Sequence, residues 1–301
     1  MISRLFNLHP HTMQVKKIAG ALGAELSDVD LRQPLSPAQA EEIRTALLDH
    51  QVIFLRKQNL TPQQFLNFAN AMGEPIDYPF LKGLPDYPQI IEVKKLEHET
   101  SNFGGIWHSD TTYLQVPPMG SMLLSREVPP YGGDTMFANQ YIAHDSLSPG
   151  MQKLLEGVKA EHSSAMVNGG ETARSAAVSR SHAPQARDRA FSASPQQTVE
   201  TVYHTTEHPV VRIHPETGRK ALYINRGFVT RFADMTPEES QPLLDYLWAH
   251  ASQPEFTCRY HWTTNDVGVW DNRCTLHFAL NDYYGHRREL HRISVHEPTR
   301  P

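Results

Sequence analysis

The segment from residue 107 to residue 135, WHSDTTYLQVPPMGSMLLSREVPPYGGDT, contains the residues on which the interpretation of this chain depends. Within it, residues 119–125 (MGSMLLS) predict a short strand. We place His108 and Asp110 on a strand of their own before it, where side chains two positions apart point to the same face. The pair can therefore bind one metal ion together, with a third ligand from elsewhere in the chain.

The candidate third ligand is His277, at the end of the segment WDNRCTLH. Two imidazoles and one carboxylate on one side of an iron ion leave open positions for a chelating co-substrate and O2, as non-haem Fe(II) oxygenases require. The histidines at 9–11 and 204–208 also lie close together, but neither group offers a carboxylate in phase with a distant histidine. We interpret them as a solvated terminus and as the start of a strand.

Two arginines follow His277 on a predicted strand. Arg288 and Arg292 are four residues apart, and this spacing places both side chains on one face of the strand. A diacid such as 2-oxoglutarate chelates iron through its keto-acid end, and its distal carboxylate needs a cation and a hydroxyl donor. Arginine gives such a carboxylate a bidentate, charge-assisted pair.

Taken together, these motifs resemble the taurine dioxygenase family, which also contains aryloxyalkanoate dioxygenases and alkylsulfatases. The resemblance covers nearly the whole chain. It is carried by WHSD at 107–110, GGDT at 132–135, HPVVR at 208–212, GRK at 218–220, WDNR at 270–273 with His277, and Arg287-Arg288 with His291-Arg292. It implies a double-stranded β-helix, a form of jelly roll, with His108, Asp110 and His277 as ligands of Fe(II). It also implies that Thr135 and Arg288 hold the distal carboxylate of 2-oxoglutarate.

The same comparison bears on the substrate pocket. Arg292 matches the family arginine that binds the acidic group of the substrate, and Phe228 matches an aromatic residue that packs on it. Tyr78 and Leu81 stand where the taurine enzyme has a histidine and a tyrosine, and Gly104 stands where it has an asparagine. Because a pocket that cannot hydrogen-bond an amine discriminates against it, we expect a larger, more apolar anion than taurine. An aryloxyalkanoate, an alkyl sulfate or a longer sulfonate would fit.

The rest of the chain predicts a mainly β fold with added helices, in a single domain over residues 1–301. Residues 17–32 predict an opening β-ribbon. Helices are predicted to start at Ser36 and Thr61 and to occupy 237–251, and further strands are predicted at 51–55, 209–213, 221–225, 255–262 and 267–270. The stretch 166–200 is poor in large apolar residues, and we interpret it as a mobile lid.

Composition limits the classes of partner. The formal net charge is -5 and no long Lys/Arg run occurs, which argues against nucleic acid. No apolar run is long enough to span a bilayer, and only Cys258 and Cys274 could form a disulfide, so we predict a cytoplasmic protein. The expected partner is a small organic anion, and we expect a homo-oligomer.

The expected reaction is hydroxylation of the anion, followed by its cleavage, with release of succinate and CO2. One alternative is a taurine dioxygenase proper. Alternatives of other classes are a zinc hydrolase with the same three ligands and a non-catalytic jelly-roll binding protein. A hydrolase has no need for Thr135 and Arg288 around a diacid, and oxygen uptake distinguishes an oxygenase from a binding protein.

Overall fold

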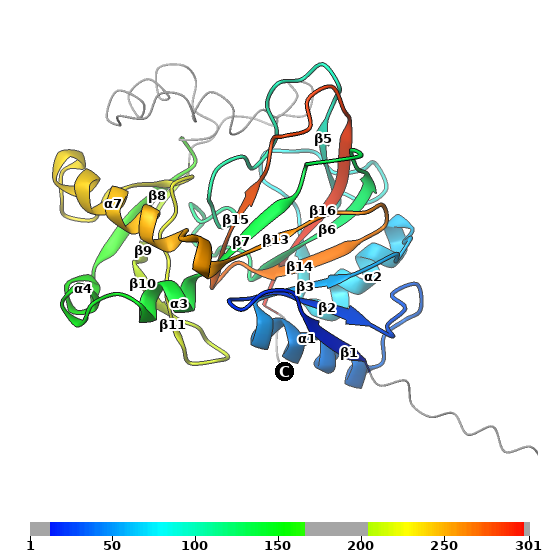
Figure 1. Ribbon diagram of the computed structural model, residues 1–301, viewed down its shortest axis with the longest axis horizontal. Coiled ribbons are helices and arrows are strands. Elements are labelled where there is room, and N and C mark those ends of the chain that lie inside the picture. The colour runs from blue at the N-terminus through cyan, green and yellow to red at the C-terminus, as the bar shows by residue number, and fades with distance from the viewer. Residues whose placement is uncertain (1–12, 166–203, 298–301) are drawn as a thin grey trace, which may run out of the picture.

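The computed structural model describes residues 13–165 and 204–297, in two layers of β-sheet with helices on the outside (Figure 1). The predicted lid at 166–200 lies outside the described residues. In the described part of the chain, no helix combines the length and the apolar character needed to cross a membrane.

The larger layer is an eight-stranded sheet in the order β1-β2-β3-β14-β6-β16-β4, with β5 also paired to β16. Its strands are β1 (Gln14–Lys17), β2 (Ala24–Ser27), β3 (Val52–Leu55), β4 (Glu74–Ile76), β5 (Ile91–Lys95), β6 (Gly120–Glu127), β14 (Val267–Asp271) and β16 (Arg288–His296). β1 and β2 form an opening ribbon as predicted, but it begins at Gln14 and ends at Ser27 rather than spanning residues 17–32. All the pairings are antiparallel except that of β2 with β3.

Three smaller sheets complete the described strands: β13-β7-β15, β12-β8-β9 and β10-β11. Their members are β7 (Thr135–Asn139), β8 (Lys159–Ser163), β9 (Thr205–Pro209), β10 (Val211–Ile213), β11 (Lys220–Leu222), β12 (Val229–Phe232), β13 (Thr257–Tyr260) and β15 (Thr275–Ala279). The β13-β7-β15 sheet faces the large sheet, because Phe137 and Tyr260 pack with Phe54 and Trp270 in one apolar cluster. The two layers confirm the predicted mainly β jelly roll.

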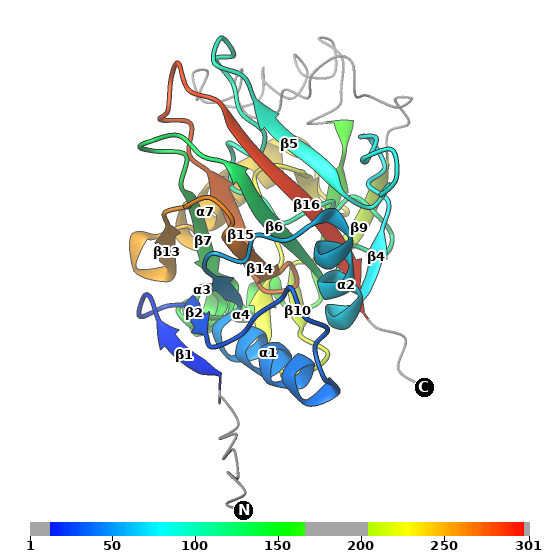
Figure 2. The same ribbon diagram turned by 90° about the vertical axis from the view of Figure 1, so that its right-hand side faces the viewer.

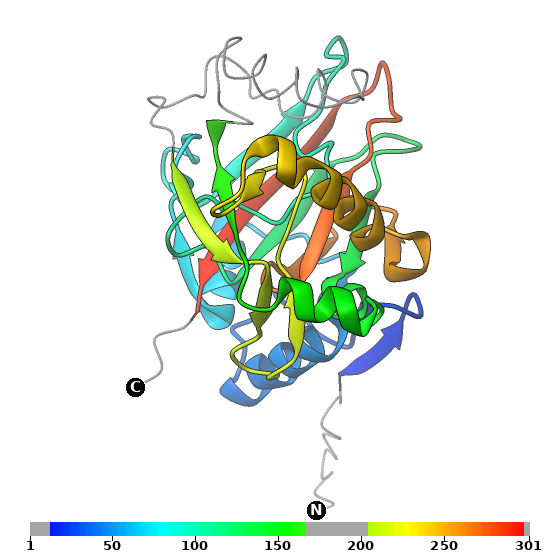
Figure 3. The same cartoon turned by 90° about the vertical axis from the view of Figure 1, so that its left-hand side faces the viewer.

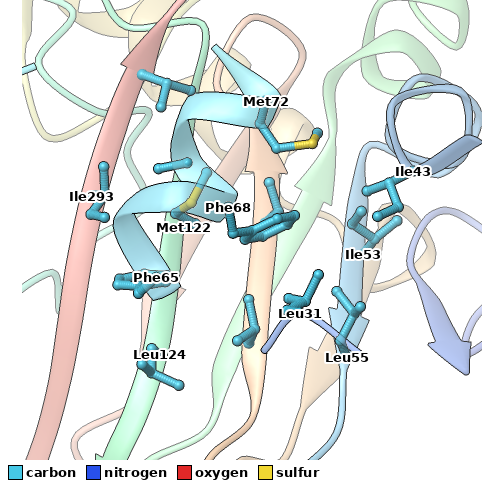
Figure 4. Packing of buried hydrophobic residues seen from close by; sticks show 14 of the residues in the cluster. Leu31, Ile43, Ile53, Leu55, Phe65, Phe68, Met72, Met122, Leu124 and Ile293 are labelled. Carbon is cyan, nitrogen blue, oxygen red and sulfur yellow. The ribbon is translucent and has the colours of Figure 1, made fainter. Parts of the chain in front are cut away.

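Two helices cover the outer face of the large sheet (Figure 2). α1 (Pro37–His50) and α2 (Pro62–Met72) start after Ser36 and Thr61, and both caps form complete capping boxes. Phe65 and Phe68 of α2 point at the strands, where they meet Met122 and Ile293 (Figure 4). This core fixes β6 and β16 from outside, so their inward-facing side chains have a rigid support.

The opposite side of the molecule carries α7 (Pro237–Ala251), drawn in yellow to orange in Figure 3, with the shorter helices α3 (Gln140–Asp145) and α4 (Pro149–Leu155). A 3-10 turn, η2 (Pro254–Phe256), leads into β13. Leu244 and Leu247 of α7 pack on Val229 and Phe232 of β12 in a second apolar cluster. The helix predicted at 237–251 is confirmed.

Two predicted local structures are wrong. The segment with His108 and Asp110 is not a strand: His108 makes one isolated bridge with His277, and the chain then turns through Thr111, whose φ is +43°. Two prolines at 117–118 follow, and proline cannot donate to a β-ladder. The strand predicted at 209–213 is split between β9 and β10, because Val210 turns to pair with Val158 and Tyr223.

Candidate metal and co-substrate site

Three potential metal ligands meet between the two layers. His108, Asp110 and His277 each present one ligand atom, and these atoms all lie within 4.8 Å of one another. The Nε2 atom of His108 lies 3.6 Å from Asp110 Oδ1, and that of His277 lies 3.5 Å from the same oxygen. All three side chains are buried. The structure therefore brings together the three ligands that the sequence predicted.

Backbone contacts hold the two histidines side by side. The N–H of His108 donates to the His277 carbonyl at 3.1 Å, and the N–H of His277 donates to the His108 carbonyl at 2.8 Å. The ring nitrogen Nδ1 of His108 lies 2.7 Å from the carbonyl oxygen of Ile106. That contact orients the ring so that Nε2 faces Asp110.

Asp110 is held as a carboxylate. Burial opposes its ionisation, but the positive charge of Arg292 is the largest influence in the other direction, and the pKa of Asp110 lies well below its usual value. Its Oδ2 accepts from the Ser121 hydroxyl at 2.7 Å and from Arg292 at 2.9 Å. Burial keeps the pKa of His277 well below its ordinary value, which favours the neutral imidazole. Two imidazole nitrogens and an ionised carboxylate fit a divalent iron ion.

A second group of residues supports the turn that carries Asp110. The side-chain oxygen of Asn272 accepts from the Asp110 N–H at 3.3 Å and from Trp270 Nε1 at 2.9 Å. Its amide nitrogen donates to Ser121 at 3.1 Å. In the sequence Asn272 stood out only as part of the WDNR motif at 270–273, and Ser121 was not singled out. The sequence signal for these two residues was weak, because the segments around Ser121 and Asn272 are brought together by the pairing of Ser121 with Trp270 across β6 and β14.

A pocket extends from the metal ligands between the layers. Its described lining residues are Val93, Phe103, Gly104, His108, Leu123, Thr135, Trp270, His277, Ala279, Arg288, Leu290 and Arg292. The two predicted co-substrate residues, Thr135 on β7 and Arg288 on β16, thus share one pocket with two of the metal ligands. The remaining walls are mostly apolar, which suits the chain of a small diacid.

Arg288 is 4% exposed, and its Nε and Nη2 atoms have no hydrogen-bond partner among the described residues. These two atoms form one edge of the guanidinium. Three other arginines of the chain, Arg32, Arg44 and Arg273, use the same edge to bind both oxygens of a carboxylate. The Arg288 edge is therefore a buried, unoccupied bidentate donor for a carboxylate.

Thr135 is oriented by a neighbour that sequence analysis did not identify. Trp262 donates its ring N–H to the Thr135 hydroxyl oxygen at 2.9 Å. A hydroxyl that accepts one hydrogen bond still has its own proton to donate. Thr135 can therefore supply the hydroxyl donor that a distal carboxylate needs, beside the guanidinium of Arg288.

The predicted substrate residues divide into two groups. Phe228 lies beside the candidate ligand His108, with its ring centroid 6.1 Å from that of the imidazole, and packs with Phe80 and Tyr113 in an aromatic cluster. Tyr78 packs against this cluster, and the Arg292 guanidinium carbon lies 5.2 Å from the Tyr78 ring centroid. Leu81 is buried, but neither the described pocket nor the aromatic cluster includes it.

Arg292 is already partly engaged, since it contacts Asp110 and donates to Ser294 at 3.2 Å. Its Nε is buried and has no partner in the described part of the chain. Gly104 lines the pocket with a φ of +82°, and a Cβ atom there would lie 3.3 Å from His108 Cε1. The polar side chain that the taurine enzyme carries at this position would be strained here.

Comparisons with known proteins agree with this geometry. A family model described as taurine catabolism dioxygenase TauD, TfdA family matches residues 14–294. The alkylsulfatase of Acinetobacter baylyi is 33% identical over 284 residues, which cover 94% of this chain and 84% of the relative. An α-ketoglutarate-dependent sulfate ester dioxygenase of Pseudomonas putida is 34% identical over 289 residues, 95% of this chain and 91% of the relative.

A crystal structure of a taurine dioxygenase from Burkholderia xenovorans has a TM-score of 0.75 and 34% identity, and the match covers 94% of this chain and 90% of that one. The family match spans nearly the whole described fold and includes every residue of the candidate site. The chain therefore belongs to the TauD/TfdA family of α-ketoglutarate-dependent dioxygenases.

Proposed function

We propose that this Fe(II)- and 2-oxoglutarate-dependent dioxygenase hydroxylates, and so cleaves, an organic anion with a large apolar part. In this proposal His108, Asp110 and His277 bind the iron. Thr135 and Arg288 bind the distal carboxylate of 2-oxoglutarate (α-ketoglutarate), and Arg292 binds the acidic group of the substrate. The observation that supports this proposal most strongly is the Nε and Nη2 edge of the Arg288 guanidinium. This edge is buried and has no hydrogen-bond partner among the described residues, in a pocket that His108 and His277 also line.

The iron, when bound, supplies the redox chemistry that lets O2 oxidise 2-oxoglutarate and the substrate together. The protein residues position the reactants. Arg288 and Thr135 hold one end of the diacid, so its keto-acid end is directed toward the metal ligands. Val93, Leu123 and Leu290 line the space between and exclude water from it.

The reaction balances as follows. One oxygen atom of O2 enters succinate as 2-oxoglutarate loses CO2, and the other becomes the hydroxyl on the substrate carbon. For a sulfate ester hydroxylated at the carbon next to the ester oxygen, the C–O bond to sulfate then breaks. Sulfate leaves with the bonding electrons, the hydroxyl releases its proton, and an aldehyde remains.

The choice of substrate rests on two features of the site. The buried Nε of Arg292, which has no hydrogen-bond partner among the described residues, can donate to an acidic group, and the cluster of Phe80, Tyr113 and Phe228 offers apolar surface beside His108. The two relatives named above act, by their names, on alkyl sulfates and sulfate esters. We therefore propose an alkyl sulfate, a longer sulfonate or an aryloxyalkanoate. Tyr78 is a contact of the acidic group in this proposal, and Leu81 a more distant part of the apolar wall.

A zinc hydrolase and a non-catalytic binding protein are disfavoured, since the chain's relatives are dioxygenases. A taurine dioxygenase proper is disfavoured by Gly104, where a side chain would crowd His108. The single domain over residues 1–301, the lid at 166–200 and the homo-oligomer remain predictions.

The test is a succinate-release screen with Fe(II), ascorbate and 2-oxoglutarate. The panel contains hexyl sulfate, a longer alkyl sulfonate, a phenoxyalkanoate and taurine, and Asp110→Ala is the inactive control. We expect substrate-dependent succinate from at least one apolar anion, with a higher kcat/KM than for taurine. Taurine as the best substrate would show that Gly104, Tyr78 and Leu81 do not shape the pocket as proposed.

A further inference from the structure

Lys95, at the end of β5, is a buried cation without a counter-ion. Its side chain is 2% exposed, and its Nζ has no hydrogen-bond partner among the described residues. Burial lowers the pKa of Lys95, and the negative charge of Glu99 opposes that shift without forming an ion pair. The Glu99 carboxylate is instead bound by the backbone N–H of Leu96 at 2.6 Å. A buried ammonium without an anion is costly, so a ligand is the natural source of the missing charge.

The strand register places Lys95 beside Arg288. The two residues are direct partners across β5 and β16, and Val93 is the partner of Leu290 in the same ladder. Val93, Leu290 and Arg288 all line the co-substrate pocket. Since side chains alternate between faces along a strand, Lys95 emerges on the pocket-facing side with Val93.

One tyrosine connects the two cations. The Nζ of Lys95 lies 4.4 Å from the centroid of the Tyr283 ring, and the guanidinium carbon of Arg288 lies 6.0 Å from the same centroid. Tyr283 is 1% exposed; burial raises the pKa of its hydroxyl, and the positive charge of Arg288 opposes that shift.

We propose that Tyr283 and Lys95 are positioning residues for the distal carboxylate of 2-oxoglutarate. Tyr283 fixes the Arg288 guanidinium so that its Nε and Nη2 edge faces the pocket. Lys95 holds the Tyr283 ring by a cation–π contact and adds a second positive charge to this end of the site. This inference rests on the proposed role of Arg288.

The experiment measures binding without turnover. Parent and variant proteins loaded with Mn(II) are titrated by calorimetry with N-oxalylglycine, an unreactive analogue of 2-oxoglutarate that keeps the distal carboxylate. A second titration uses 2-oxovalerate, which has the keto-acid end but no distal carboxylate. The matched control is Lys94→Met, because Lys94 is the neighbouring lysine on β5 and is ion-paired with Glu92 and Glu289.

For Lys95→Met we expect N-oxalylglycine to bind about threefold to tenfold more weakly, the range set by a partly buried cation–π contact. Binding of 2-oxovalerate should stay unchanged, and Lys94→Met should alter neither ligand. Tyr283→Phe keeps the ring and removes the hydroxyl, so it should also weaken N-oxalylglycine alone. The losses from Lys95→Met and Tyr283→Phe should not add in the double variant, because both act through one contact.

Two results would overturn the inference. The first is unchanged N-oxalylglycine affinity in both Lys95→Met and Tyr283→Phe, and the second is an equal loss for both ligands, which indicates a merely structural role. Arg288→Ala separates the inference from the proposed function. If Arg288→Ala weakens N-oxalylglycine and the other two variants do not, only the positioning role fails. If Arg288→Ala also has no effect, the proposed co-substrate site fails.

Discussion

Two buried clusters of this protein contain the same kinds of residue and differ in what surrounds them. His108, Asp110 and His277 form one. His214, Asp271 and Cys274 form the other, where the turn after β10 meets the turn between β14 and β15. In both, ligand-type atoms lie within 4.8 Å of one another, and all six residues are buried. By composition alone, either cluster could hold a metal ion.

The second cluster is filled by the protein itself. Arg273 donates to both oxygens of Asp271, at 2.9 and 2.6 Å, and His214 Nε2 lies 3.0 Å from the same carboxylate. The other ring nitrogen of His214 accepts the N–H groups of Glu216 and Thr217. Burial raises the pKa of Cys274 well above its usual value, so its thiol is not a ready ligand.

In the first cluster the contacts leave one oxygen of the carboxylate facing the metal position. Ser121 and Arg292 bind Asp110 Oδ2, and among the described residues only the two histidines face Oδ1. Arg292 thus binds one oxygen of Asp110, whereas Arg273 binds both oxygens of Asp271. The difference teaches that a ligand site is recognised by how far the protein itself already saturates the carboxylate, rather than by residue types.

The largest expected effect comes from substitutions in the two clusters, which test the comparison between them directly. His108→Ala, Asp110→Ala and His277→Ala should each abolish 2-oxoglutarate turnover and Fe(II) binding while the fold stays largely intact. His214→Ala should retain Fe(II) binding and lower only the stability. Anaerobic equilibrium dialysis and circular dichroism check both expectations, and three triad variants with full iron-dependent activity would show that the assignment is wrong.

The next effect concerns the filled cluster. Arg273→Met leaves the Asp271 carboxylate buried beside His214 without its bidentate partner, so we expect the free energy of unfolding to fall by about 3–5 kcal/mol. Denaturant unfolding measures it. Arg219→Met is the control: the Arg219 side chain is 46% exposed and its Nη2 lies 3.7 Å from Asp145 Oδ2, and such surface pairs contribute about 0–1 kcal/mol. Equal stabilities of the two variants would contradict the role given to Arg273.

A smaller effect is expected at the other end of the pocket. Arg288→Ala removes the hydrogen-bond donor to the distal carboxylate, which should cost about 1.5–3 kcal/mol of binding free energy. KM for 2-oxoglutarate should therefore rise about tenfold to 150-fold. KM for the organic anion should change much less, because in the proposed function its acidic group is bound by Arg292 and not by Arg288. Steady-state kinetics with each reactant varied in turn separate the two, and an unchanged KM for 2-oxoglutarate would rule out this role.

A feature of this protein could be predicted from the sequence when the residues that determine it lie close together in the chain. Helix starts at Ser36, Thr61 and Thr236 were predictable, because a cap, a proline and an amphipathic run lie within a few residues. The candidate metal ligands were recognisable by resemblance, although the strand assumed for His108 and Asp110 was wrong. The contacts of Asn272 and Trp262 could not be predicted, since they join residues 162 and 127 positions apart that only the tertiary fold brings together.

The smallest expected effect is the change in kcat/KM for each methylene added to the substrate. If the cluster of Phe80, Tyr113 and Phe228 receives the apolar tail, each methylene that becomes buried there adds about 0.8 kcal/mol, or about fourfold in kcat/KM. A series of linear alkyl sulfates should therefore rise in steps and then level off where the tail passes the cluster. Phe228→Leu keeps most of the side-chain volume but removes the ring that packs on Tyr113, so it should reduce the steps without removing activity. If kcat/KM does not rise with chain length from the shortest alkyl sulfate onward, the tail lies elsewhere. If each added methylene raises kcat/KM equally in the parent and in Phe228→Leu, the tail does not contact Phe228.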